Sequence, residues 1–416
     1  MYNILFLFVI FVGVVEFRIP GLNYWDEVML MAVPLYYVIQ KRKLQIKRAN
    51  LKKWITLAIF IIAGIAGNIL HPNFQNSFIA ILKDIIAALK FPILAIVMLV
   101  DRGKKKQAKI LHEAAIISKY SIYFMLMIAI LGYFIDIGVY QNEIRFVKCY
   151  QFAFSHPTFM VSSLIMMVAV LMADDMKKNR ISLLCAAFLI FLSGRVKGYV
   201  MVLLMLMIIV VRPSMIERIF YRIKNKLKIK KRYFLPITFA FVILGYCLGR
   251  EKIDLYLHWG LTAARPALYI MGFQLAKDFF PFGSGFGTFA SSISGKYYSN
   301  VYRIYRIDDV NGMTKDNFSY IADTFLPYIY GQFGIVGTVA YVSLFIQIIK
   351  DQFRKQKSYN RIIAFLFLWT YALVASTAET YFTNSSAVQF IVVLLVFVGN
   401  ERIKLSENKG ENLDEK

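Results

Sequence analysis

Arg195 and Lys197 lie in a polar break between two short apolar runs, in the segment LSGRVKG at 192–198. A short turn there needs the small residues of that segment, but it does not need two cations. Arginine suits phosphate because its planar fork donates two parallel, charge-assisted hydrogen bonds. The two cations therefore either anchor the turn at lipid headgroups or bind an anion in a cavity.

Further arginines, among them Arg250 and Arg265, lie in a long polar stretch at 249–324, which also contains a GSGFG turn at 283–287. This turn is neither a Walker loop nor a Rossmann fingerprint, because no Gly-Lys-Ser/Thr ends it and no strand is expected before it. Two interpretations stay open. The glycines allow close backbone packing, or they expose backbone N–H groups to a phosphate.

Charged residues also interrupt the apolar run 78–100, at Lys83, Asp84 and Lys90. Charges at membrane depth are costly, so they face a bundle interior or a water-filled cavity. Lys83 and Lys90 are seven residues apart, which places them on one helix face about 10 Å from each other. Lys83 and Asp84 can extend toward the membrane surface, so Lys90 is the stronger candidate for a functional cation.

The elements that must position these residues are membrane helices. The chain has 416 residues, of which 58% are hydrophobic and 36 are Phe, too many for one soluble globule. We predict an all-α, polytopic bundle of about 12 transmembrane helices, several of which extend into flanking polar residues to reach the length of a span. The apolar runs are 2–15, 27–40, 54–70, 78–100, 116–135, 157–173, 181–192, 198–211, 233–248, 325–349, 361–376 and 385–399.

The basic residues predict the topology. Most of the 49 Lys and Arg residues fall in short segments that share one side of the membrane if both termini are cytoplasmic. This divides the chain into helices 1–9 at 1–248, a large extracytoplasmic loop at 249–324, helices 10–12 at 325–400 and a cytoplasmic tail at 401–416. The net charge of +24 then reflects topology and contact with anionic lipids, so no nucleic-acid partner is expected.

The sequence predicts neither a metal site nor a cofactor. The three Cys and four His residues are scattered, without the spacing of a zinc site or a disulfide framework. Within the 249–324 loop, Pro266 starts a pattern of apolar residues at Leu268, Met271, Leu275 and Phe279, which is typical of an amphipathic helix lying at the membrane surface.

Several of these segments resemble one family. An Arg-led helix followed by a glycine-rich turn (265–289), then DTFLP at 323–327 and GQFGIVG at 331–337, is similar to the outer loop and following helix of bacterial O-antigen and capsular polysaccharide polymerases of the Wzy type. These enzymes share a superfamily with O-antigen ligases. FSHP at 154–157 and SGR at 193–195 resemble two further landmarks in the same order. Some polymerases carry Gly eleven residues after Arg, whereas Arg195 leads to Leu206 and Arg265 to Ala276.

The resemblance implies transfer of a glycan from undecaprenyl diphosphate to a hydroxyl of another lipid-linked repeat unit, at the outer face of a bacterial plasma membrane. Cations would hold the departing diphosphate without a metal, and a base would take the acceptor proton. The expected diphosphate ligands are Arg195, Lys197, Arg250, Arg265 and Lys90. Asp323 or Asp316 is the expected base, with His156 in reserve, and Arg195 and Arg265 are the expected catalytic cations.

Two other functions stay open. A ligase would carry a late histidine in the outer loop, but the segment 315–323 has none. A flippase or another transporter typically shows an internal repeat, and we find none. Besides membrane lipids and the lipid-linked substrates, the implied partners are a chain-length regulator and a flippase of the same pathway.

Overall fold

The computed structural model describes residues 2–16, 18–19, 21–41, 48–98, 104–144, 147–210, 254, 258–356 and 358–397. Within these ranges the protein is nearly all helical, which confirms the all-α part of the predicted fold. Five helices are long and apolar enough to cross a membrane: α3 (Arg48–Leu70), α5 (Lys104–Phe134), α6 (Pro157–Asp175), α14 (Phe325–Lys355) and α15 (Tyr359–Ser376). In a bilayer a helix satisfies all its own backbone hydrogen bonds, and this favours helix in such apolar runs.

Every other predicted run whose residues are described is also a helix. These are α1 (Tyr2–Val15), α2 (Trp25–Lys41), α4 (Phe78–Met98), α7 (Arg180–Leu192), α8 (Val196–Val210) and α16 (Ser385–Phe397). The run 233–248 and the tail 401–416 lie outside the described residues. The count of about 12 spans therefore stays a prediction.

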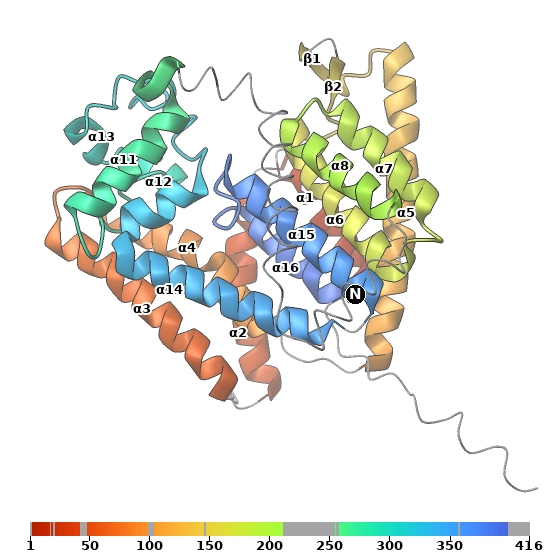
Figure 1. Ribbon diagram of the computed structural model, residues 1–416, viewed down its shortest axis with the longest axis horizontal. Coiled ribbons are helices and arrows are strands. Elements are labelled where there is room, and N and C mark those ends of the chain that lie inside the picture. The colour runs from red at the N-terminus through yellow and green to blue at the C-terminus, as the bar shows by residue number, and fades with distance from the viewer. Residues whose placement is uncertain are drawn as a thin grey trace, which may run out of the picture.

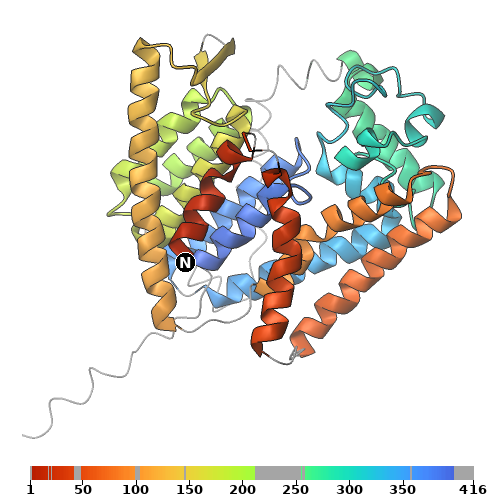
Figure 2. The same ribbon diagram turned by 180° about the vertical axis from the view of Figure 1, so that it is seen from behind.

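The helices form two groups with α15 and α16 between them (Figures 1 and 2). One group contains α2, α3, α4 and α14, with α14 packed along α3. The other contains α1 and α5 to α8, and its central helix α6 is almost wholly buried, packed against α5 and α15. The outward faces carry exposed apolar residues, such as Ile62 on α3 and Phe188 on α7, as lipid-facing helices do.

A two-stranded antiparallel hairpin follows α5, in a segment for which the sequence predicts no element. Strand β1 (Tyr140–Ile144) pairs with β2 (Val147–Tyr150), with Tyr140 opposite Tyr150. Both tyrosines fasten the hairpin to α5: Tyr150 donates to the Met125 carbonyl at 2.6 Å and Tyr140 to the Ala129 carbonyl at 2.8 Å.

The polar segment before α14 is compact. It contains the 3-10 helix η2 (Gly260–Thr262), α11 (Ala264–Asp278), α12 (Ser292–Lys296) and α13 (Val301–Ile304). The helix predicted near Pro266 is α11, and its Leu268 and Leu275 are buried where it packs on α14. Outside the predicted apolar face, Phe273 is also apolar and is 70% exposed.

The glycine turn at 283–287 is a site of close backbone packing. A Cβ atom on Gly283 would lie 2.4 Å from the backbone nitrogen of Gly334, and one on Gly285 would lie 2.5 Å from that of Asn68. The turn's N–H groups are already used: Gly285 donates to the Gln332 carbonyl at 2.8 Å, and Gly287 to the Asp84 carboxylate at 2.9 Å. The close-packing interpretation therefore holds, and these N–H groups are not directed at a phosphate.

Candidate functional site

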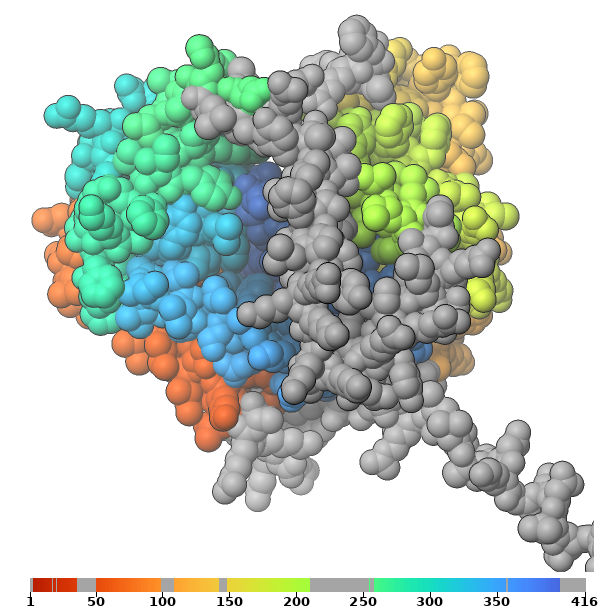
Figure 3. Space-filling model, in the orientation of Figure 1, coloured from red at the N-terminus to blue at the C-terminus, as the bar shows by residue number. Residues whose placement is uncertain are grey.

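A cavity of about 680 Å³ lies where the ends of several helices meet. Its walls come from the start of α6, the turn between α7 and α8, the start of α11, the residues before α14 and the loop after α15. Besides Tyr320, the ionisable side chains that line it are His156, Arg195, Lys197, Arg265, Asp323 and Glu379. Figure 3 shows one face of this region, with α11 and α14 on one side, α7 and α8 on the other, and part of the dark blue C-terminal segment between them.

Local structure fixes His156 and Arg195 at adjacent helix ends. His156 is the N-cap of α6, where Pro157 begins the helix, and its Nδ1 accepts from the Thr158 N–H at 3.2 Å. Arg195 follows Gly194, whose φ of 68° ends α7 sharply enough for α8 to start at once. As a result, the Arg195 Nη2 lies 2.9 Å from the His156 Nε2.

The His156 ring is neutral. Burial lowers its pKa to about 4, and the charges of Arg195 and then Lys197 add to this effect. A neutral imidazole has only one lone pair for hydrogen bonding, yet Arg195 and the Thr158 N–H both point donors at its two nitrogens. Thr158 and Arg195 therefore compete for a single lone pair, and while Nδ1 accepts from Thr158 the Arg195 guanidinium has no acceptor on the ring.

Lys197 pairs with a carboxylate that sequence reasoning missed. Its Nζ lies 2.7 Å from the Glu379 Oε1, and both side chains are mostly buried. Glu379 belongs to the loop between α15 and α16. A single acidic residue in a short loop is common and does not indicate a site. The one useful signal in the sequence is the predicted topology, which places Glu379 and Lys197 at the same end of the bundle.

Arg265 and Asp323 form the second ion pair of the cavity. The Arg265 Nη2 lies 3.0 Å from the Asp323 Oδ2. Arg265 stands in the first turn of α11, and Asp323 comes just before the N-cap of α14, so packing of α11 on α14 brings the two together. Burial raises the pKa of Asp323, and Arg265 opposes that shift.

The described side chains of the cavity thus carry more positive than negative charge. Three cations face two carboxylates among them, and His156 is neutral. Within the described ranges, Arg195 has no carboxylate partner, and its Nε is buried without a hydrogen bond. A half-buried cation in this state favours an anionic ligand.

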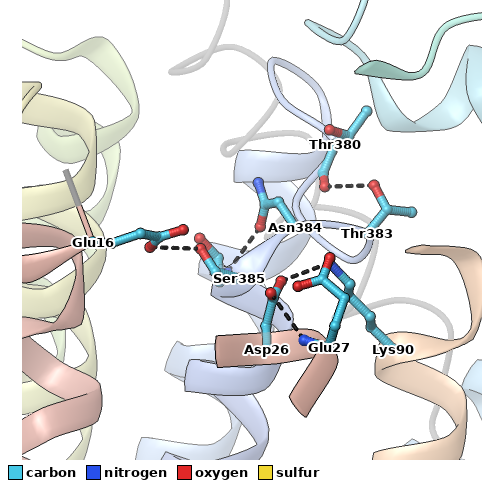
Figure 4. Close-up of polar contacts among 9 residues, drawn as sticks. Glu16, Asp26, Glu27, Lys90, Thr380, Thr383, Asn384 and Ser385 are labelled. Atoms are coloured by element: carbon cyan, nitrogen blue, oxygen red, sulfur yellow. Dashed lines mark hydrogen bonds and ion pairs between the residues drawn. The ribbon is translucent and has the colours of Figure 1, made fainter. Parts of the chain in front are cut away.

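The remaining predicted residues lie elsewhere. Lys90 is buried between the start of α2 and α4, where its Nζ is 2.7 Å from the Asp26 Oδ2 and 2.6 Å from the Glu27 Oε1 (Figure 4). Asp316 is exposed and does not line the cavity. Arg250 lies outside the described residues.

In the described part of the chain, no group of three or more His, Cys, Asp or Glu side chains is placed to hold a metal ion. The comparisons with known proteins add no assignment. No family model, no curated protein and no solved structure matches this chain.

Proposed function

We propose that this protein is a membrane-embedded polysaccharide polymerase, which transfers a glycan from undecaprenyl diphosphate to a hydroxyl of another lipid-linked repeat unit on the outer face of the plasma membrane. One observation carries the proposal. Five side chains that the sequence singles out for this chemistry, from four separate segments, line one cavity: His156, Arg195, Lys197, Arg265 and Asp323.

In this proposal the three cations hold the diphosphate of the donor. Arg195 and the Nε2–H of His156 donate to one phosphate, and this gives Arg195 the anionic partner that it lacks among the described residues. Lys197 and Arg265 reach the diphosphate by exchanging their carboxylate partners for phosphate oxygens. Lys90 is left out of this set because Asp26 and Glu27 already neutralise it.

The transfer step needs one base. The acceptor hydroxyl oxygen attacks the anomeric carbon, the bond from that carbon to the phosphate oxygen breaks, and undecaprenyl diphosphate leaves with the bonding electrons. The cations stabilise the charge that grows on the diphosphate. The proton of the hydroxyl goes to Asp323. This carboxylate becomes more basic when Arg265 turns to the diphosphate, because the cation that opposes its raised pKa is then neutralised.

Two experiments test the function. Deleting the gene in its host should remove long surface chains and leave single repeat units on lipid at the outer face. Long chains that persist, or repeats trapped at the inner face, would instead favour a ligase or a flippase. In vitro, the purified protein in liposomes should convert lipid-linked repeat units into a ladder of longer lipid-linked glycans, and absence of any ladder would contradict the proposal.

A further inference from the structure

A second cavity, of about 200 Å³, lies beside the first. Its walls come from the end of α1, the turn into α2, and the starts of α6 and α16. Phe159 borders both cavities. The polar side chains that line the second cavity are Glu16, Asn23, Ser155, Ser163, Ser385 and Gln389.

The deepest polar groups of this cavity still have acceptor capacity. Ser163 is 1% exposed and Gln389 is 6% exposed. The Ser163 hydroxyl donates to the Ile10 carbonyl at 2.8 Å, and the Gln389 amide donates to the Val9 carbonyl at 2.9 Å. These bonds use donors and leave oxygen lone pairs for a ligand. Polar oxygens are costly among apolar helices unless they meet a polar partner.

Glu16, the residue after α1, and Ser385, the first residue of α16, face each other across the cavity (Figure 4). The Ser385 hydroxyl lies 3.4 Å from the Glu16 Oε2, which is a long and therefore weak hydrogen bond. A ligand hydroxyl between them would donate to the carboxylate and accept from the serine. A carboxylate, an amide and several hydroxyls beside an aromatic wall form the mixed surface that a sugar ring needs, because such a ring has hydroxyl edges and apolar faces.

The position of the cavity relates it to the proposed diphosphate site. Ser155 lines the second cavity and the next residue, His156, lines the first. We propose that the second cavity binds one sugar ring of the lipid-linked glycan. This inference rests on the proposed function and adds a glycan-binding subsite to it, formed by Glu16, Ser385, Asn23 and the buried oxygens of Ser163 and Gln389.

A comparison of the binding of two lipids, one with and one without sugar, distinguishes this subsite from the diphosphate site. We would measure equilibrium binding to the purified protein in nanodiscs, using undecaprenyl diphosphate without sugar and the lipid-linked repeat unit extracted from the host. Ser385→Ala and Glu16→Gln should each weaken binding of the repeat unit about three- to tenfold, the effect of one lost hydrogen bond, and leave binding of the bare lipid unchanged. Arg195→Lys should weaken binding of both lipids.

The matched control is Ser386→Ala, because Ser386 is the next residue of α16, is buried and does not line the cavity. It should bind both lipids as the wild type does. Equal affinity changes for the two lipids, or none, in Ser385→Ala and Glu16→Gln would overturn the subsite and leave the polymerase proposal standing. If the wild type binds both lipids but forms no polymer, the proposed function fails while the selective effect still identifies a glycan-binding site.

Discussion

Arg195→Lys is the most direct test of the cavity chemistry, because it keeps the positive charge and removes the planar guanidinium with its parallel N–H donors. The Arg195 guanidinium is half-buried, lies 2.9 Å from the His156 Nε2 and has no carboxylate partner among the described residues. Lysine replaces two parallel donors by a single nitrogen, so one charge-assisted hydrogen bond to the diphosphate is lost. Loss of one donor to a developing anion costs about 2.7–4 kcal/mol, which predicts a kcat about 10²- to 10³-fold lower.

The assay is the initial rate of chain elongation in liposomes supplied with lipid-linked repeat units. Arg180→Lys is the matched control, because Arg180 begins α7, is exposed and lies at the end of that helix away from the cavity. It should retain the wild-type rate. If Arg195→Lys stays within about threefold of the wild type, a difference below 1 kcal/mol, the arginine does not hold the leaving group and the reasoning is refuted.

Three further predictions concern the base, the histidine and the glycine turn. Asp323→Asn should lower kcat about 10²-fold or more at saturating substrate, because it removes the base. Glu379→Gln should lower kcat by a smaller factor, and the reverse order would assign the base to Glu379. The folded-state pKa of His156 is about 4, below its unfolded value of 6.5, so the unfolded chain binds more protons and stability falls as pH drops through this window. Melting temperatures in detergent from pH 7 to 4 should therefore fall less for His156→Gln than for the wild type, and parallel curves would contradict this. Gly285→Ala forces a Cβ to within 2.5 Å of the Asn68 backbone at a φ of 96°, so it should lower the melting temperature. A melting temperature equal to that of the wild type would contradict the packing described.

The helices could be predicted because apolar runs in a membrane leave the backbone no alternative to its own hydrogen bonds. Every apolar run within the described ranges is a helix, and the helix predicted near Pro266 begins at Ala264. The hairpin at 140–150 was missed because its pairing depends on anchors in α5, at Met125 and Ala129, which local sequence does not reveal.

The cavity was predictable only in part, because, as in the hairpin, its contacts join residues that are far apart in the sequence. Arg195 and Lys197 are conspicuous in a turn that needs only small residues, but their partners His156 and Glu379 are distant in sequence. Lys90 shows the limit of such reasoning. Its charge within an apolar run marked it as a candidate, yet its counter-ions at the start of α2 are more than 60 residues away in the sequence. The sequence alone could therefore not distinguish a neutralised lysine from a free one.

The contacts of the glycine turn have a consequence for how this protein can diverge. The segment 283–287 contacts α3, α4 and α14 through its own main-chain atoms, with Gly283 and Gly285 against Gly334 and Asn68 and the Gly287 N–H on the Asp84 carboxylate. Contacts made by the main chain of the turn do not depend on exposed side chains elsewhere in the segment that follows it. The exposed residues between the turn and Asp323, such as Lys296, Arg303 and Arg306, can therefore be exchanged without disturbing these contacts, and under the proposed function this is where a new glycan specificity would arise.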